Sequence, residues 1–261
     1  MSGRVVVVGA GHGGSQLCIS LREQGWTGEI LLFGEESHSP YHRPPLSKTF
    51  LQSDAPAEVP MLRSPEVYKQ NGVRLCTGEK VIALDPEKRN VRTEKGRMEP
   101  YDTLVLATGA DVSRPPVPGA EDPRGLGLRT LEDAGRIHEA AEVAKSALIL
   151  GGGFIGLEVA ASLRTRGLEV TVLEREERVM ARVVGPEISE AFETLHRERG
   201  VKLHLGVTAE GIHYPGSGAE VMLSNGEALC ADLLVMGAGA APRSELEIGR
   251  ASCRERVCHR V

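Results

Sequence analysis

Two stretches of the chain decide its fold: residues 4–14 read RVVVVGAGHGG, and residues 147–156 read ALILGGGFIG. Each is a short apolar run followed by the pattern G-x-G-x-x-G and then by a helical pattern, near 15–24 and near 157–165. In both copies a second apolar strand then ends in an acid, within ILLFGE at 30–35 and VTVLE at 170–174. A strand, a glycine turn and a helix in this order are typical of a βαβ unit that binds a dinucleotide.

The internal repeat extends well beyond the glycine loops. VRLCTG at 73–78 matches VKLHLG at 201–206, and YDTLVLATG at 101–109 matches ADLLVMGAG at 231–239. Turn signals at 94–96 and 224–226 separate short alternating strands inside each copy. We therefore predict an α/β fold with two Rossmann-like domains, each a parallel sheet with helices plus a small antiparallel meander.

The domain boundary is expected near residue 110, since 111–127 is rich in proline and glycine. The predicted domains are 1–110 and 111–246. The last fifteen residues show no helix or strand period, and 247–257 resemble the in-frame translation of a sequencing-library adapter. We expect 247–261 to be a non-native tail, and a metal or redox role for its cysteines, Cys253 and Cys258, to be improbable.

Each glycine has its own expected task. The first makes the turn, the second lets a pyrophosphate approach the backbone, and the third lets helix and strand pack closely. The acids Glu35 and Glu174 are expected to accept hydrogen bonds from ribose hydroxyls, and a carboxylate at Glu174 favours NADH over NADPH because it repels a 2′-phosphate. A single such loop could be only a glycine-rich turn, but two copies with the correct context argue against that alternative.

Copy one carries an insertion. The first glycine and the following Val-x-Leu strand are 64 residues apart in copy one (9 to 73) and 50 in copy two (151 to 201), about 14 fewer. The extra residues fall in 38–60, which contains PYHRPPLSK at 40–48. Because only one copy carries this segment, chemistry that differs between the two copies is expected there.

Composition narrows the class of protein. The net charge of −5 and the pI of about 6.0 argue against a surface built for nucleic acid or anionic membrane. No apolar run reaches the length of a membrane span. The cysteine count is odd and the first three cysteines are far apart in the sequence, so a reduced, cytoplasmic protein is predicted. No metal site is expected. Cys18, Cys76 and Cys230 are interpreted as small core residues.

The chain resembles the NADH-dependent ferredoxin reductases of bacterial oxygenase systems, flavoproteins such as putidaredoxin and rhodocoxin reductases. The resemblance covers about residues 3–246. It rests on the two glycine loops, PYHRPPLSK at 40–48, TLVLATG at 103–109, LRTL at 128–131, GGGFIGLE at 151–158 and the segment 179–187. It implies electron transfer from NADH through FAD to a ferredoxin-type iron–sulfur protein.

The resemblance also assigns residues to the two cofactors. FAD is expected in the first copy, at Gly9, Gly11, Gly14, Glu35, Arg43, Lys48, Val81, Ala107, Thr108, Gly109 and Arg129. NAD is expected in the second, at Gly151, Gly153, Gly156, Glu174, Gly237 and Gly239. Catalytic roles fall on Lys48, on Glu158 as the acid that pairs with it beside the flavin, and on Phe154, which would cover the flavin. Without the resemblance, Lys48 and Glu158 could be surface charges, and Phe154 could be plain core packing.

In the family, a further Gly-Asp flavin motif and a C-terminal domain follow the second copy. The resemblance therefore implies that the FAD domain at 1–110 lacks its return segment here, and that this chain holds little FAD. Two alternatives stay open. One is another flavoprotein of this fold, such as an NADH oxidase, which usually carries a catalytic cysteine near the flavin. The other is an inactive fragment that at most binds NAD.

Overall fold

A computed structural model describes residues 3–55 and 57–246 of the chain. The predicted non-native tail at 247–261 lies outside the described residues. The chain divides into two compact units. Of the described residues, unit 1 holds 3–42, 60–110 and 242–246, and unit 2 holds 43–55, 57–59 and 111–241.

Unit 1 is built on a four-stranded parallel sheet in the order β3-β2-β1-β7. Alternate residues of β1 point to opposite faces, as the period of a strand requires. Val5 and Val7 pack with Cys18 and Tyr68 from the helical side, while Val6 and Val8 belong to a second cluster. The second cluster is closed by the antiparallel strands β4, β5 and β6, so this face of the sheet is covered by the predicted meander. The elements are β1 (Arg4–Val8), α1 (His12–Glu23), β2 (Glu29–Phe33), α3 (Pro65–Gln70), β3 (Val73–Cys76), β4 (Val81–Asp85), β5 (Asn90–Thr93), β6 (Met98–Pro100) and β7 (Thr103–Leu106).

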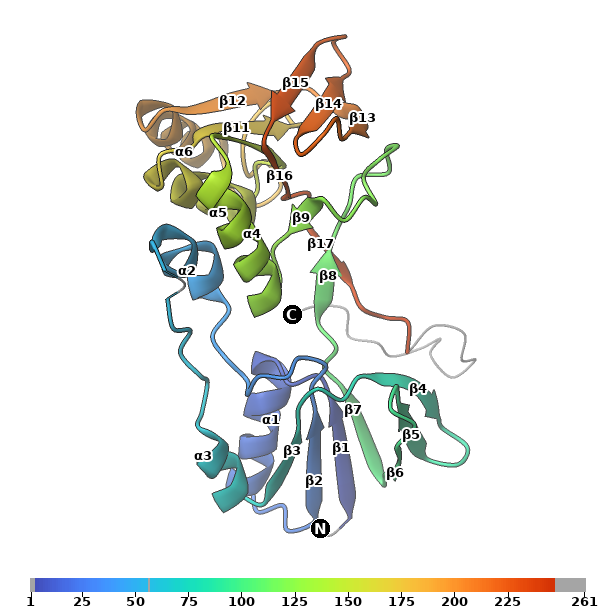
Figure 1. Ribbon diagram of the computed structural model, residues 1–261. Helices are drawn as coiled ribbons and strands as arrows, with labels where there is room; N and C mark the ends of the chain where they lie inside the picture. Colours follow the sequence, from blue (N-terminus) through green and yellow to red (C-terminus); the bar gives the residue numbers. More distant parts are fainter. Residues whose placement is uncertain (1–2, 56, 247–261) are drawn as a thin grey trace. The chain divides into compact units, whose positions relative to one another are not determined.

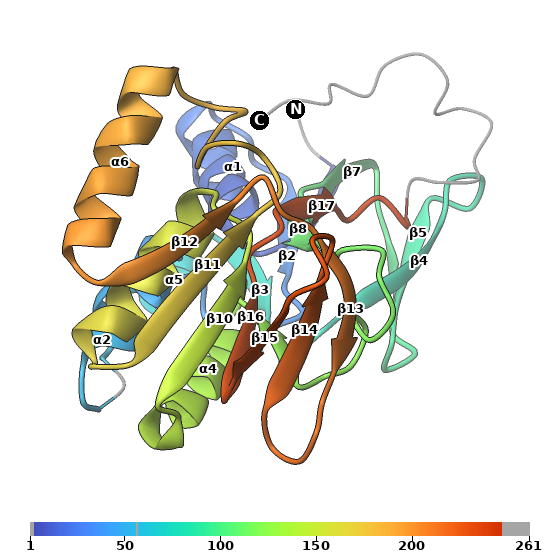
Figure 2. The same ribbon diagram turned by 90° about the horizontal axis from the view of Figure 1, so that it is seen from above.

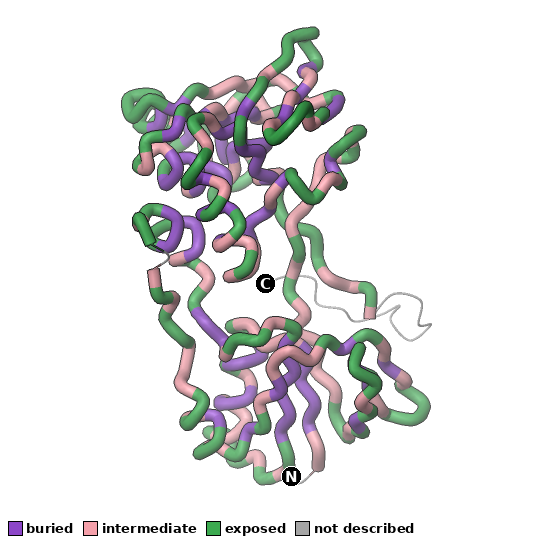
Figure 3. The backbone as a smooth tube through the Cα atoms, viewed as in Figure 1, coloured by how far each residue is buried: buried purple, intermediate pink, exposed green. Residues whose placement is uncertain are grey.

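Unit 2 repeats this plan with a five-stranded parallel sheet in the order β12-β11-β10-β16-β9, of which Figure 2 labels β12, β11, β10 and β16. Leu148 and Leu150 of β10 pack with Ile212 and Val221 of the antiparallel meander β13–β15. The central strands of both sheets are buried, as Figure 3 shows. The elements are β9 (Gly125–Gly127), α4 (Leu131–Val143), β10 (Ser146–Leu150), α5 (Phe154–Thr165), β11 (Glu169–Glu174), α6 (Pro186–Glu198), β12 (Val201–Leu205), β13 (Ala209–His213), β14 (Ala219–Leu223), β15 (Ala228–Ala231) and β16 (Leu233–Met236).

Two strands lie where the chain passes between the units: β8 (Ala110–Val112) pairs with β17 (Ala240–Pro242). No helix among the described residues is long and apolar enough to cross a membrane. The predicted α/β class, with its two parallel sheets and two meanders, is confirmed.

The central part of the insertion in copy one, residues 43–59, belongs to unit 2. It forms the 3-10 helix η1 (Pro44–Ser47) and the short helix α2 (Thr49–Gln52), and α2 packs against α4 and α5 of unit 2 (Figure 1). The buried side chains of Leu46, Phe50 and Leu51 explain why the segment leaves unit 1. The predicted boundary at 110 coincides with one crossing point of the chain, but residues 43–59 belong to unit 2.

Candidate functional site

The first and third glycine of each loop are required by the backbone. A Cβ added at Gly9, whose φ is +113°, would lie 2.0 Å from the carbonyl oxygen of Ala107. A Cβ at Gly14 would lie 2.0 Å from the oxygen of Gly9. The second copy repeats this geometry, with 2.3 Å between a Cβ at Gly151 and the oxygen of Gly237, and 2.0 Å between a Cβ at Gly156 and the oxygen of Gly151. The lack of a Cβ at these four glycines therefore allows the close backbone contacts of the strand–helix turn.

The middle glycines face open space. A Cβ at Gly11 or at Gly153 would meet no atom within 4 Å. These two residues are the N-caps of α1 and α5, and neither helix has a side-chain cap or an acid in its first turn. The exposed amides of a helix N-terminus attract a phosphate through their N–H groups and the helix dipole. Both loops therefore fit the pyrophosphate of a dinucleotide.

The predicted ribose acid of unit 2 is fixed by its own loop. Glu174, at the end of β11, accepts hydrogen bonds from the backbone N–H of Gly152 at 2.6 Å and of Glu176 at 3.0 Å. Each bond uses a different carboxylate oxygen, so the side chain is oriented before any ligand arrives. A fixed carboxylate beside the glycine loop suits a ribose diol, since each oxygen keeps a further lone pair.

The predicted ribose acid of unit 1 lies in a cluster of two cations. Glu35 pairs with Lys80 at 2.8 Å and with Arg243 at 2.6 Å. Partial burial would raise the pKa of Glu35, but the hydrogen bonds and charges of Lys80 and Arg243 outweigh it and lower the pKa below 4.5. Sequence reasoning missed both cations. Arg243 is 208 residues away from Glu35 in the chain, so no local pattern could have revealed it.

The ends of β7 and β16 reach the glycine loops. In unit 1, Thr108 Oγ1 donates to the carbonyl of Arg243 at 2.7 Å, and the carbonyl of Gly109 accepts from the Arg243 N–H at 3.0 Å. In unit 2, the N–H of Gly237 donates to Leu150 at 2.7 Å. Gly239 has a φ of +111° and open space where a Cβ would lie. The side chain of Val81 is buried in the cluster that the meander of unit 1 closes, and the predicted position of Val81 along the flavin stays a prediction.

Two charged residues of the insertion, Lys48 and Arg43, bond to predicted site residues elsewhere in unit 2. Lys48 Nζ lies 2.8 Å from Glu158 Oε2, so the expected ion pair is present. The same carboxylate oxygen accepts a hydrogen bond from Ser47 Oγ at 2.5 Å. Arg43 donates to the carbonyl oxygen of Arg129, which brings a second pair of predicted residues together.

Phe154 is the first residue of α5, and 52% of it is exposed. Its alternative reading as a core residue is therefore wrong. An exposed ring at a helix start, next to the glycine loop, can cover a planar ligand, and this role stays a prediction.

The cysteines differ from one another more than expected. Cys18 is fully buried, and burial raises the pKa of its thiol to about 12. Cys76 is also buried, but Cys230 on β15 is exposed, so its interpretation as a core residue is wrong. The strand β15 is at the edge of its three-stranded sheet, and Cys230 faces outward from it.

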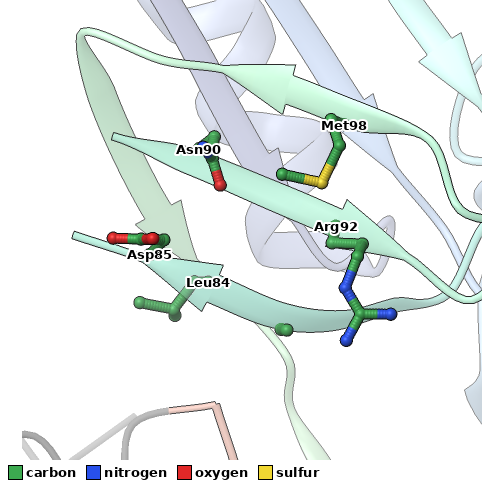
Figure 4. Close-up of a pocket in the computed structure, with 6 residues that line it drawn as sticks. Leu84, Asp85, Asn90, Arg92 and Met98 are labelled. Atoms are coloured by element: carbon green, nitrogen blue, oxygen red, sulfur yellow. The ribbon is translucent and has the colours of Figure 1, made fainter. Parts of the chain in front are cut away.

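Two hollows in the surface lie apart from these residues. A shallow pocket of about 410 Å³ on the meander of unit 1 is lined by Ala83, Leu84, Asp85, Asn90, Arg92 and Met98, most of them labelled in Figure 4. A second, of about 540 Å³, lies in unit 2 between Asp111, Arg114 and Arg136. Neither is lined by a glycine loop or by a predicted ribose acid.

Two parallel sheets with glycine loops at helix N-termini and acids at strand ends are typical of a dinucleotide-binding fold. Residues 3–257 match the family described as pyridine nucleotide-disulphide oxidoreductase, and the chain belongs to that family.

Three comparisons bear on its place in the family. Rhodocoxin reductase of Rhodococcus erythropolis is 38% identical over 243 residues, which are 93% of this chain and 57% of that protein. The crystal structure of a ferredoxin reductase from Rhodopseudomonas palustris matches with a TM-score of 0.88 at 40% identity, over 93% of this chain and 60% of that one. A water-forming NADH oxidase from Lactobacillus brevis matches with a TM-score of 0.84 at 26% identity, over 94% and 55%. The chain thus spans little more than half the length of these relatives.

Proposed function

We propose that this chain forms the two nucleotide-binding units of an NADH-dependent flavoprotein that passes electrons to a ferredoxin-type iron–sulfur protein. The observation that carries the proposal is the ion pair between Lys48, in segment 43–59, and Glu158. The sequence of this segment contains no cysteine. The similarity to rhodocoxin reductase and to a ferredoxin reductase supports the same acceptor class.

The proposal assigns FAD to unit 1 and NAD to unit 2. Gly11 and Glu35 would hold the pyrophosphate and the ribose of FAD, and Gly153 and Glu174 those of NADH. When bound, the two cofactors supply the hydride transfer and the onward electron transfer, while the protein positions them. Arg43, Lys48 and Arg129 would then offer positive charge to the flavin or its phosphates.

The ion pair has a specific task in this proposal. The Lys48 ammonium would offer positive charge to a reduced flavin bound beside it, and Glu158, its ion-pair partner, would moderate that cation. The exposed ring of Phe154 would cover the flavin at the place where the nicotinamide stacks. An NADH oxidase is the second candidate, favoured by the match to the Lactobacillus brevis enzyme.

A cytoplasmic location belongs to the proposal as well, consistent with the three free cysteines among the described residues.

A double-mutant cycle tests the proposal. The chain is supplied with excess FAD and mixed anaerobically with NADH, and the loss of flavin absorbance is followed by stopped flow. Lys48→Met is expected to slow flavin reduction by roughly tenfold, because it leaves Glu158 as an unpaired negative charge, whereas Glu158→Gln alone removes the group that moderates the cation and should not slow it. The double variant should lose less than the sum, with a coupling of roughly 0.5–3 kcal/mol. Lys88→Met, which changes a largely exposed lysine of unit 1, is the control.

The acceptor is tested in the same cuvette. Oxidised [2Fe–2S] ferredoxin should reoxidise the reduced flavin faster than dissolved oxygen does. Faster reoxidation by oxygen, with water or peroxide as product, would favour the oxidase. Strict additivity in the cycle would make Lys48 and Glu158 ordinary surface charges.

A further inference from the structure

Three polar side chains spaced by four residues lie along α5 and its C-cap: Glu158 and Ser162 in the helix, and Arg166 at the C-cap. Residues at this spacing lie one above another along a helix. Each of the three bonds to the inserted segment. Glu158 accepts from Ser47 and Lys48, the Ser162 hydroxyl donates to the carbonyl of Ser47, and Arg166 donates to the carbonyl of Leu51 at 3.4 Å. Side chains along α5 and its C-cap therefore contact the inserted segment at Ser47, Lys48 and Leu51.

Ser162 is the central and most deeply buried of the three. Its exposed fraction is 0%, and its neighbours Val159, Ala160 and Leu163 are equally buried. A buried hydroxyl is costly unless it is hydrogen-bonded. Ser162 Oγ donates to the carbonyl of Ser47 at 2.6 Å and accepts from Gln52 Nε2 at 3.2 Å, and both partners belong to the insertion. Among the described residues, both hydrogen-bond partners of the Ser162 hydroxyl therefore belong to the docked segment.

The far side of the segment is held by α4. His138 is fully buried, and its Nε2 bonds to the carbonyl of Ser53 at 2.8 Å. The His138 ring meets Phe50 edge to face. Segment 47–53 is therefore held by α5 on one side and by α4 on the other. Lys48 is the residue of this segment whose side chain reaches Glu158 in an ion pair.

We propose that Ser162 is a positioning residue for Lys48. Its hydroxyl fixes the backbone at Ser47, one residue before Lys48, and one helical turn from the carboxylate that Lys48 must meet. Without that bond the segment can shift along α5, and the ammonium leaves Glu158. The consequence for flavin reduction rests on the proposed function, but the placement of Lys48 does not.

The test measures the chemical accessibility of Lys48 in the chain without added cofactor. The protein is labelled with a limiting amount of an amine-acetylating reagent, and the modified peptides are quantified by mass spectrometry. Lys80 is a matched internal reference, because its side chain is also 47% exposed and also pairs with a glutamate at 2.8 Å. Ser162→Ala should raise the labelling rate of Lys48 by about three- to tenfold, the effect of one lost hydrogen bond, and leave Lys80 unchanged.

Three further variants make the result specific. Thr165→Ala removes a hydroxyl of the same helix that donates to the carbonyl of Ala161, within the helix itself, and this change should have no effect. Ser162→Thr restores a hydroxyl and should return Lys48 towards its wild-type rate. Gln52→Ala removes the second bond of Ser162 from the partner side, which gives an independent test if Ser162→Ala folds poorly.

Two results would overturn the positioning role. One is a Ser162→Ala protein that loses stability while Lys48 keeps its wild-type labelling rate. The other is equal gains at Lys48 and Lys80, which would indicate general loosening. Increased labelling of Lys48 without any change in NADH-dependent flavin reduction would leave the positioning role intact and contradict the catalytic use of Lys48 in the proposed function.

Discussion

The three glycines of the unit 2 loop differ in what requires them. The fold requires Gly151 and Gly156, whereas we expect ligand binding to require Gly153. Gly156→Ala would bring a Cβ to 2.0 Å from a backbone oxygen, whereas Gly153→Ala adds a methyl group in open space. We expect Gly156→Ala to destabilise the protein by about 1–3 kcal/mol. Gly153→Ala should keep the stability and weaken NADH binding, because the methyl group occupies the approach to the helix N-terminus.

Urea unfolding measures the first effect, and titration of the nicotinamide fluorescence measures the second. Comparable losses of stability in the two variants would show that the middle glycine is also structural.

Glu174 decides, in our reading, between NADH and NADPH. Its two carboxylate oxygens are held by loop amides, so the negative charge stays where a 2′-phosphate would lie. Glu174→Ala should narrow the preference for NADH by roughly tenfold, or about 1.4 kcal/mol. The ratio of the NADH and NADPH dissociation constants measures this. Glu169→Ala, at the start of the same strand, is the control. Equal affinities in the wild-type protein would disprove the role of the carboxylate.

At the scale of elements, Glu35 follows the end of β2 and ties it to two other segments. Its lowered pKa has a predictable sign. The pairs with Lys80 and Arg243 stabilise unit 1 above the ordinary carboxyl value of 4.5, and this contribution disappears as pH falls through the lower folded value.

Glu35→Gln should therefore be less stable than wild type near neutral pH, and the difference should shrink in acid. Chemical unfolding at a series of pH values measures it. A difference between the two proteins that stays constant from neutral pH to well below 4.5 would contradict the ion-pair account.

At the scale of the whole molecule, residues 43–59 lie within the first copy of the sequence repeat but belong to unit 2. NADH bound in unit 2 should stabilise that unit by about 2.7 kcal/mol at a ligand concentration of 100 times Kd. Amide hydrogen exchange should then slow in 111–241 and in η1 and α2 together. The strands β1–β3 of unit 1 are the internal control. Protection of α2 without any change in 111–241, or the reverse, would show that the insertion is not part of unit 2.

The sequence by itself determined the two glycine loops, the repeated sheets and the position of the insertion along the chain. These depend on local signals: alternation in strands, glycines at turns and an acid at a strand end. It also indicated the Lys48–Glu158 pair, through resemblance. The tertiary structure decided the partners of those residues. Arg243 reaches Glu35, and Ser162 reaches Ser47, across separations that no short pattern spans. It also decided that the insertion packs with unit 2, since the burial of Phe50 and Leu51 depends on helices distant in sequence.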